Sequence, residues 1–298
     1  MRNERKTGHL LTEKINSNTT HIDSSSTDEI FDLICNEDEQ ILSSIRQQKK
    51  NIVDAIELII LCLRSVGRLI FVGAGTSGRL GVMESAECPP TFGTDPDLIK
   101  GIIAGGKEAL MSSIEGAEDS TDEAVKELES VKLCDNDIVV GIAASLNTPF
   151  VESALVFAKE IGCKTVLITC NSGNPDFSDV TINLMVGPEV IVGSTRMKAG
   201  TATKMVLNIL TTASMVRMGK TYGNLMVDVQ PSSAKLKDRA KRIVIDLTGV
   251  DESEAEELLE KSDWDVKASI VMKNKNVDLP EAKNLLAEKE GFLKKVIS

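Results

Sequence analysis

Five short runs of apolar and β-branched residues alternate with helical patterns in the middle of the chain, and this alternation constrains the fold more than any other feature. Continuous apolar strands are typical of a parallel sheet that helices cover on both faces. The pattern therefore predicts a doubly wound α/β fold that binds ligands beyond the carboxyl ends of its strands. The runs are RLIFV at 68–72, KGIIA at 100–104, DIVVGIA at 137–143, KTVLIT at 164–169 and VTINLMV at 180–186.

Helical patterns precede and follow these runs. An N-cap signal at Ser26 predicts a helix through Ile34, and an amphipathic pattern over about 37–66 breaks near Gln48. A single long helix is expected at about 194–220. Helices should therefore come before the first strand and after the last strand of the sheet.

The chain after Pro231 is charged and helical in its pattern. Its segment TGVDESEAEELLEKSDWDVKASIVM has the rhythm of the short helices in a small three-helix, UBA-like bundle. The apolar faces of such a bundle would include Leu258, Leu259, Trp264 and Ile270. We expect a structural or dimer-supporting role for this segment rather than a catalytic one.

Composition argues against several classes of partner. The formal net charge of −11 disfavours binding to nucleic acid or to an anionic membrane, because both are themselves negatively charged. No apolar stretch approaches the ~18 residues that a membrane span needs, and the N-terminus lacks a signal-peptide core, so a cytoplasmic location is expected. Six cysteines without a C-x-x-C pair fit neither a zinc site nor a disulfide framework, and we expect reduced thiols.

The two histidines, His9 and His21, both lie in a polar segment that covers residues 1 to about 26. This segment is rich in Ser, Thr and Asn, and it is expected to be a mobile arm or a strap laid over a neighbour. No metal centre built on imidazole is expected. General acid–base chemistry therefore falls to carboxylates, unless the arm folds back over a site.

The loop after the first strand is glycine-rich and reads GAGTSGR at 73–79. Gly75 and Gly78 allow the backbone to approach a ligand closely, and the amides of the helix start form an anion pocket with the hydroxyls of Thr76 and Ser77. The loop also matches G-x-G-x-x-G, but a dinucleotide site needs an acidic residue where the second strand ends. That strand ends in Ala-Gly-Gly. A phosphomonoester is therefore favoured over a dinucleotide.

A second loop that bears hydroxyls, AASLNTP, follows the third strand and contains Ser145 and Thr148. Two such loops at neighbouring strand ends could converge on one phosphate and form a sugar-phosphate site. Each loop taken alone could equally supply an ordinary N-cap for the helix that follows it.

Carboxylates follow the first and second strands. Glu84 and Glu87 are three residues apart in the helix after the first loop, so they share a face, and the sequence predicts that Cys-Pro-Pro ends this helix. The segment EGAED after the second strand contains Glu115, Glu118 and Asp119. Most carboxylates of an acidic protein are merely solvated, so this pattern alone selects none of them.

Long motifs extend over nearly the whole chain: GAGTSGRLGVMESAECPPTFG at 73–93, IIAGG at 102–106, IEGAED at 114–119, VGPEVIVGSTRMKAGTATKMVLN at 186–208 and YGNLMVDVQ at 222–230. Together they closely resemble the signature of N-acetylmuramic acid 6-phosphate etherases. The resemblance implies a sugar isomerase (SIS) domain at 51–232, between an N-terminal arm with helices at 1–50 and a C-terminal helical bundle at 233–298. It also implies a homodimer, a small phosphosugar as substrate, and no metal or organic cofactor.

The family cleaves the ether that joins D-lactate to carbon 3 of N-acetylmuramic acid 6-phosphate, and it releases N-acetylglucosamine 6-phosphate and D-lactate in the recycling of cell-wall sugar. The resemblance implies the same activity here, a carbon–oxygen lyase of the hydro-lyase class. By the match, Glu87 falls on the family's acid/base glutamate and Glu118 on its second catalytic glutamate. Ser77, Ser145 and Thr148 would hold the phosphate.

Two cations begin the long helix in the segment GSTRMKAGTA. From chemistry alone, we expect either Arg196 or Lys198 to pair with the lactyl carboxylate. The alternative is that both are surface cations on a helix.

The chain departs from the family in the third-strand loop, where the family normally reads Ala-Ser-Gly-Arg-Thr-Pro and this chain has Leu146 and Asn147. If the glycine serves a positive φ, Leu146 would be strained by ~1–3 kcal/mol or would reshape the loop. Two other functions stay open at this point. One is a non-catalytic regulatory protein that senses a sugar phosphate, and the other is an aldose–ketose phosphosugar isomerase.

Overall fold

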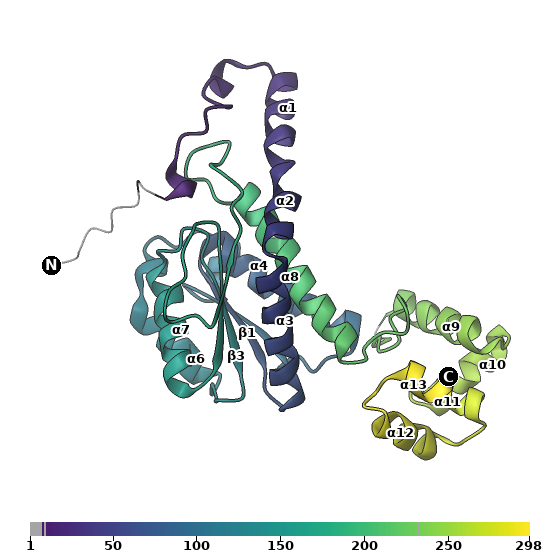
Figure 1. Cartoon of the computed structure of the whole chain (residues 1–298). Coiled ribbons are helices and arrows are strands. Elements are labelled where there is room, and N and C mark those ends of the chain that lie inside the picture. Colours follow the sequence, from purple (N-terminus) through teal and green to yellow (C-terminus); the bar gives the residue numbers. More distant parts are fainter. Residues whose placement is uncertain (1–7, 9, 232) are drawn as a thin grey trace. The chain divides into compact units, whose positions relative to one another are not determined.

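The computed structural model describes residues 8, 10–231 and 233–298 (Figure 1). The described residues fall into two compact units, and each unit is formed by two segments of the chain. The first unit is drawn from Met1–Ser85 and Asp97–Leu210, and the second from Ala86–Pro96 and Thr211–Ser298. The three domain ranges expected from the sequence stay a prediction.

A five-stranded parallel sheet forms the centre of the first unit, as the sequence predicted. Its strand order is β2-β1-β3-β4-β5, and every neighbouring pair is parallel. All carboxyl ends therefore share one edge, and the order reverses between β1 and β3, where open α/β sheets bind their ligands. The strands are β1 (Leu69–Gly73), β2 (Ile99–Ile103), β3 (Ile138–Ile142), β4 (Lys164–Thr169) and β5 (Val180–Asn183).

Helices cover both faces of this sheet (Figure 1). Ile70 of β1 packs on one face with Leu155 of the helix after β3. Phe71, its neighbour in sequence, faces the opposite side, where a Cβ added at Gly81 would lie 2.9 Å from the Phe71 Cβ. The alternation along β1 therefore separates two apolar layers. The covering helices are α6 (Thr121–Ser130) and α7 (Pro149–Ile161) on the first face, and α3 (Lys49–Arg64) and α4 (Gly75–Phe92) on the second.

Three α-helices precede β1 within the described residues, and their limits follow local signals. Helix α1 (Thr27–Asp38) begins with a capping box, in which the Ser26 hydroxyl accepts the N–H of Glu29 and the Glu29 carboxylate accepts the N–H of Ser26. The helix continues past Ile34, where the sequence predicted its end. Helices α2 (Gln40–Gln47) and α3 are separated at Gln48, where the break was expected.

Helix α4 corrects one expectation from the sequence. The Cys-Pro-Pro run at 88–90 does not end the helix, which continues through both prolines to Phe92. Proline keeps a helical φ, and although it lacks an N–H and its ring crowds the preceding turn, the residues after it can still make helical hydrogen bonds. The last turn is closed by bonds from the Gly93 N–H to the Pro89 carbonyl (2.9 Å) and from the Thr91 hydroxyl to the Glu87 carbonyl (2.8 Å).

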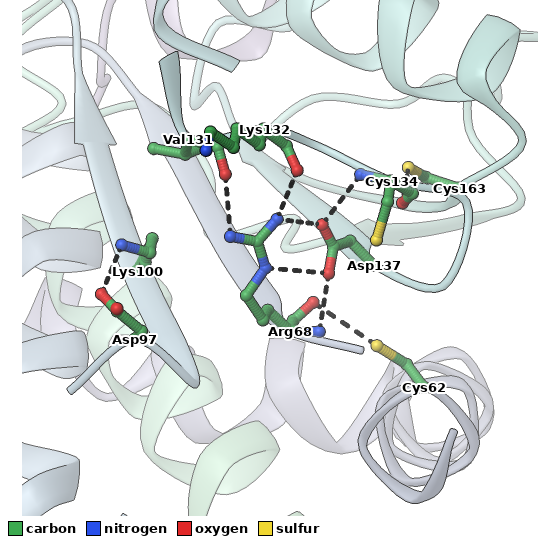
Figure 2. Close-up of polar contacts among 9 residues, drawn as sticks. All are labelled: Cys62, Arg68, Asp97, Lys100, Val131, Lys132, Cys134, Asp137 and Cys163. Atoms are coloured by element: carbon green, nitrogen blue, oxygen red, sulfur yellow. Dashed lines mark hydrogen bonds and ion pairs between the residues drawn. The ribbon is translucent and has the colours of Figure 1, made fainter. Parts of the chain in front are cut away.

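A buried ion pair joins the amino ends of β1 and β3 (Figure 2). The Asp137 side chain is 0% exposed, and Arg68 donates to it from Nη2 (2.5 Å), Nε (3.1 Å) and its backbone N–H (2.8 Å). Arg68 also donates to the carbonyls of Val131 and Lys132. Burial works to raise the pKa of Asp137, but hydrogen bonds from Arg68 and from the Cys134 N–H outweigh it and hold that pKa below its ordinary value.

Three cysteines lie around this pair (Figure 2). The Cys163 thiol donates to the Cys134 carbonyl (3.0 Å), and the Cys62 thiol donates to the Arg68 carbonyl (3.4 Å). Burial, followed by the charge of Asp137, raises the pKa of Cys62 and of Cys163 to about 12. Both thiols therefore stay protonated at neutral pH. All six cysteines of the chain are free.

The second unit contains a bundle of short helices. Leu259 and Ile270 are fully buried in its core, and Leu258 and Trp264 pack against that core while partly exposed. Within the described residues, no helix combines the length and the apolar composition required to cross a bilayer. The helices are α9 (Ala234–Thr248), α10 (Glu252–Lys261), α11 (Val266–Lys275), α12 (Leu279–Glu288) and α13 (Leu293–Ile297).

The substitution Asp137→Asn tests the buried ion pair. We expect a loss of about 2–3 kcal/mol in the free energy of unfolding at pH 7, because the variant keeps the hydrogen-bonding shape but leaves Arg68 without its counter-charge. The native pKa of Asp137 is depressed, so its stabilisation is present above the unfolded pKa of about 3.9 and is lost as the pH falls through the native value. Urea titrations at pH 7 and pH 3 should therefore show a gap between wild type and variant that narrows in acid.

The matched control is Asp97→Asn, which removes an exposed carboxylate bound to Lys100 near the same end of the sheet (2.6 Å). The urea midpoint of this control should stay close to that of the wild type. If the difference in unfolding free energy between wild type and Asp137→Asn were equal at pH 7 and pH 3, the stabilising role of the Asp137 charge would be contradicted.

Candidate active site

The glycine-rich motif of residues 73–79, named the anion loop after its expected ligand, covers the end of β1 and the first turn of α4. Gly75 has φ +52°, and no atom lies within 4 Å of the position that its Cβ would occupy, so its backbone is open to a ligand. Gly78 has no such room, because a Cβ there would lie 2.6 Å from the Gly73 carbonyl oxygen. The Thr76 and Ser77 side chains are half-buried beside the first amides of the helix. These amides carry the positive end of the helix dipole, which favours a phosphate.

The second hydroxyl loop leaves β3 at the same edge of the sheet. Ser145 Oγ and Thr148 Oγ1 lie 3.5 Å apart, and β3 is the direct neighbour of β1. Thr148 occupies the N-cap position of α7, but its side chain makes no capping hydrogen bond. The Thr148 hydroxyl therefore does not cap α7, which contradicts the alternative that this loop only supplies an N-cap.

Leu146, in the same loop, has a left-handed backbone with φ +68°. Glycine adopts this conformation without cost, whereas a side chain such as leucine is strained by ~1–3 kcal/mol. The Leu146 side chain packs so closely on the next loop that a Cβ at Gly173 would lie 2.6 Å from its Cδ2. The loop thus keeps the backbone shape that a glycine would favour, even though it holds leucine.

A cavity of about 250 Å³ joins the anion loop to Glu118. Gly75 lines this cavity together with Glu115 and Glu118, which belong to the segment that follows β2. Glu118 is part of a short 3₁₀ turn (Ala117–Asp119) that begins after Gly116, whose φ of +77° turns the chain. The structure therefore brings one of the two candidate glutamates to the loop that would hold the phosphate.

The two glutamates of α4 have different surroundings. Glu84 is 5% exposed, and its Oε2 accepts a hydrogen bond from Lys204 Nζ of α8 (Lys198–Arg217) at 2.6 Å. Lys204 also donates to Asn208. Glu87 lies one helical turn further along, and its side chain is exposed. Glu84 thus serves the packing of α4 on α8, while the carboxylate of Glu87 is accessible to a ligand.

The two candidate cations for the lactyl carboxylate differ as well. Lys198 is 0% exposed, and its Nζ is bound to Glu37 of α1. Arg196 lies just before α8 and is exposed. The ammonium of Lys198 is therefore already neutralised inside the protein, and Arg196 is the accessible cation of the two.

A cluster of buried polar groups surrounds Lys198, and sequence reasoning missed it. Glu37 also accepts hydrogen bonds from Asn16 Nδ2 and Asn18 Nδ2, each at 2.8 Å. Burial works to raise the pKa of Glu37, but the bonds from Asn18, Lys198 and Asn16 outweigh it and hold that pKa below its ordinary value. Nearby, Glu189 accepts the first two backbone N–H groups of α8 (3.0 and 2.9 Å), and burial raises its pKa.

The described part of the N-terminal arm packs against its own α/β unit. The Leu11 N–H donates to Asn171 Oδ1 (2.6 Å), and the Gly193 N–H donates to the Thr12 carbonyl (3.2 Å). Asn171 also donates to the carbonyl of Ala144, which begins the second hydroxyl loop (2.8 Å). The arm thus does fold back, onto the edge of the sheet where the ligand loops lie.

The two histidines contribute little to this picture. His9 lies outside the described residues, and His21 is exposed beside a 3₁₀ turn (Ile22–Ser24). Among the described residues, no group of three or more His, Cys, Asp and Glu side chains could hold a metal ion. The candidate acid–base groups of the described site are carboxylates.

Comparison with known proteins gives the family. The model of the glucokinase regulatory protein N-terminal SIS domain matches residues 51–159. The N-acetylmuramic acid 6-phosphate etherase of Geobacillus thermodenitrificans is 48% identical over 97% of this chain and 99% of its own length, and that of Trichodesmium erythraeum is 47% identical over 99% and 96%. Among solved structures, a phosphoheptose isomerase from Neisseria gonorrhoeae aligns with a TM-score of 0.48 and 17% identity over 63% of this chain and 99% of that one. Because nearly half of all positions are identical over almost the full length of the first two proteins, this chain belongs to the N-acetylmuramic acid 6-phosphate etherase family.

Proposed function

We propose that this protein cleaves the D-lactyl ether of N-acetylmuramic acid 6-phosphate, giving N-acetylglucosamine 6-phosphate and D-lactate, in the recycling of cell-wall amino sugar. The observation that carries the proposal is the cavity that Gly75 of the anion loop shares with Glu118. A phosphate bound at the start of α4 would place the attached sugar within reach of carboxylates. The curated relatives, which carry the name of this activity, support the same assignment.

The chemistry needs acid–base groups. Ring opening exposes an aldehyde at carbon 1, which acidifies the proton on carbon 2. Glu87 removes this proton, the bond between carbon 3 and the ether oxygen breaks, and Glu118 protonates the departing lactate oxygen. Water then adds to carbon 3 of the unsaturated aldehyde, Glu118 takes a proton from the water, and Glu87 returns its proton to carbon 2. The sum is one water consumed and one lactate released.

Hydroxyls and amides would bind the phosphate, and a cation would bind the lactyl group. The amides and side chains of Gly75, Thr76, Ser77 and Gly78 supply one side, and Ser145 and Thr148 supply the other. The uncapped hydroxyl of Thr148 supports this role. Arg196 is proposed to pair with the lactyl carboxylate, because it is exposed whereas Lys198 is bound to Glu37.

A homodimer in the cytoplasm is the proposed working form. Large apolar side chains are exposed on the first unit, among them Phe31 of α1 (66% exposed) and Ile191 before α8 (51% exposed). A second protein surface that covered these side chains would remove apolar area from water. The free cysteines fit a reducing compartment. Light scattering coupled to size exclusion should give about twice the chain mass of 32.2 kDa, and a monomer at micromolar concentration would contradict the dimer.

The substitutions Glu87→Gln and Glu118→Gln test the proposed mechanism. Each removes a proton-transfer group while keeping its size, so kcat for D-lactate release should fall by about 10²–10⁴-fold with a smaller change in KM. D-lactate can be measured with a coupled dehydrogenase. The matched control is Glu129→Gln, an exposed glutamate of α6 that should keep wild-type turnover.

Unchanged turnover in both glutamate variants would contradict the mechanism. Tight binding of the substrate by wild-type protein without lactate release would instead favour a sugar-phosphate-sensing regulator. Interconversion of glucosamine 6-phosphate and fructose 6-phosphate would favour an isomerase.

The double substitution Leu146→Gly with Asn147→Arg tests the altered loop. Glycine removes the strain at φ +68°, and arginine adds a cation to a loop that is proposed to hold phosphate. We expect KM for the substrate to fall several-fold, measured from initial rates of lactate release. An unchanged KM would show that the departure from the family pattern is harmless to binding.

A further inference from the structure

Arg79 occupies the second turn of α4, in the same motif as the anion loop, and it reaches across to the segment after β2. Its Nε donates to the carbonyl of Leu110 (3.2 Å), and its Nη2 donates to the carbonyl of Ser112 (3.0 Å). Leu110 belongs to the four-residue helix α5 (Glu108–Met111), and Ser112 follows that helix directly. Carbonyls at the end of a helix lack intrahelical partners, so the guanidinium satisfies two groups that need a donor.

The segment that Arg79 holds leads directly to Glu118. From Ser112 onward its own hydrogen bonds are mostly short-range, such as Ser113 Oγ to Glu115 Oε1 (3.2 Å) and the Ala117 N–H to the Ile114 carbonyl (3.4 Å). Met111, the residue directly before the segment, is 89% exposed, so its side chain does not anchor the start of the segment. The two bonds from Arg79 span more than 30 residues of sequence and fix this start to α4.

Arg79 also lines the cavity that contains Gly75 and Glu118. Its side chain is half-buried, and its hydrogen bonds to the segment use Nε and Nη2, while Nη1 has no hydrogen-bond partner among the described residues. A guanidinium is planar and donates in fixed directions from two different nitrogens, here Nε and Nη2, whereas a lysine side chain ends in a single nitrogen. The side chain thus connects the helix that would bind the phosphate with the segment that carries the carboxylate.

We propose that Arg79 is a positioning residue, which sets the distance between the anion loop and Glu118 by docking the Ser112–Glu118 segment on α4. This inference rests on the proposed function, because it assigns Arg79 a part in the same reaction. A carboxylate displaced by about 1 Å can cost about 10²-fold in rate, so loss of the two bonds should reduce turnover without removing any reacting group. Phosphate binding at the start of α4 should persist, because those amides belong to the helix itself.

The test compares Arg79→Ala and Arg79→Lys with the wild-type protein. We expect kcat for D-lactate release to fall by about 10²-fold in Arg79→Ala, with KM changed less than about threefold. Guanidinium added at millimolar concentration should restore part of the rate of Arg79→Ala. Arg79→Lys should remain impaired, because its single nitrogen cannot take the places of both Nε and Nη2. Arg64→Ala, an exposed arginine at the end of α3, is the matched control and should retain wild-type turnover.

Hydrogen exchange gives a readout that does not depend on activity. The amides of residues 112–118 should exchange faster in Arg79→Ala than in wild type, while those of β1 and β3 should keep their protection. Unchanged exchange in the 112–118 segment would overturn the inference, even if the protein proves to be an etherase.

A double-mutant cycle separates this inference from the proposed function. If Arg79 acts through Glu118, Arg79→Ala should have little further effect on the residual rate of Glu118→Gln. If the rate loss of the double variant equalled the product of the two single losses, the positioning role would be overturned, while the assignment of Glu118 would stand. Full activity in Glu118→Gln would instead overturn the proposed role of Glu118, and the positioning role with it.

Discussion

The parallel pairing of β1 with β2 and β3 is the constraint on which the rest of this structure depends. Gly73, the last residue of β1, lies opposite Ile103 of β2 and Ile142 of β3, so the loops after all three strands leave the sheet at one edge. The anion loop, the segment of Glu118 and the second hydroxyl loop are neighbours for this reason alone. The buried pair of Arg68 and Asp137 holds β1 and β3 at their other ends, and thereby supports the geometry of the site from the opposite edge of the sheet.

Buried charge ties the N-terminal arm to the start of α8. Lys198 and Glu37 would each be costly to bury alone, but together with the two asparagines of the arm they satisfy one another. Glu189 accepts the first amides of α8 beside them, which combines a helix cap with a compensating charge. The arm is therefore an integral part of the first unit. Its contact with Asn171, which itself donates to the Ala144 carbonyl, links the arm to the start of the second hydroxyl loop.

The features predicted correctly from the sequence are those that depend on residues close together along the chain. All five strands appeared as apolar runs, the break at Gln48 and the cap at Ser26 had local signals, and the two hydroxyl loops followed from strand ends. Long-range pairing left no such signal: Glu37 and Lys198 lie 161 residues apart, and nothing near Lys198 indicated that its ammonium was already bound. The predicted end of α4 was wrong because the residues after the two prolines still close a helical turn, with the Gly93 N–H bound to the Pro89 carbonyl. The role of Arg79 depends on backbone carbonyls of another segment. Every residue has such a carbonyl, so the sequence could not indicate which ones Arg79 contacts.

The backbone of the second hydroxyl loop is set by its surroundings rather than by its own residues. Leu146 keeps a glycine-like conformation while its N–H bonds to the Ala143 carbonyl and its side chain rests on Gly173. The strands on either side fix the backbone conformation of this loop, so different side chains can occupy it with the same main-chain path. The loop sequence can therefore change while its backbone conformation stays the same. Chains with different residues in this loop can present the same backbone amides to a ligand.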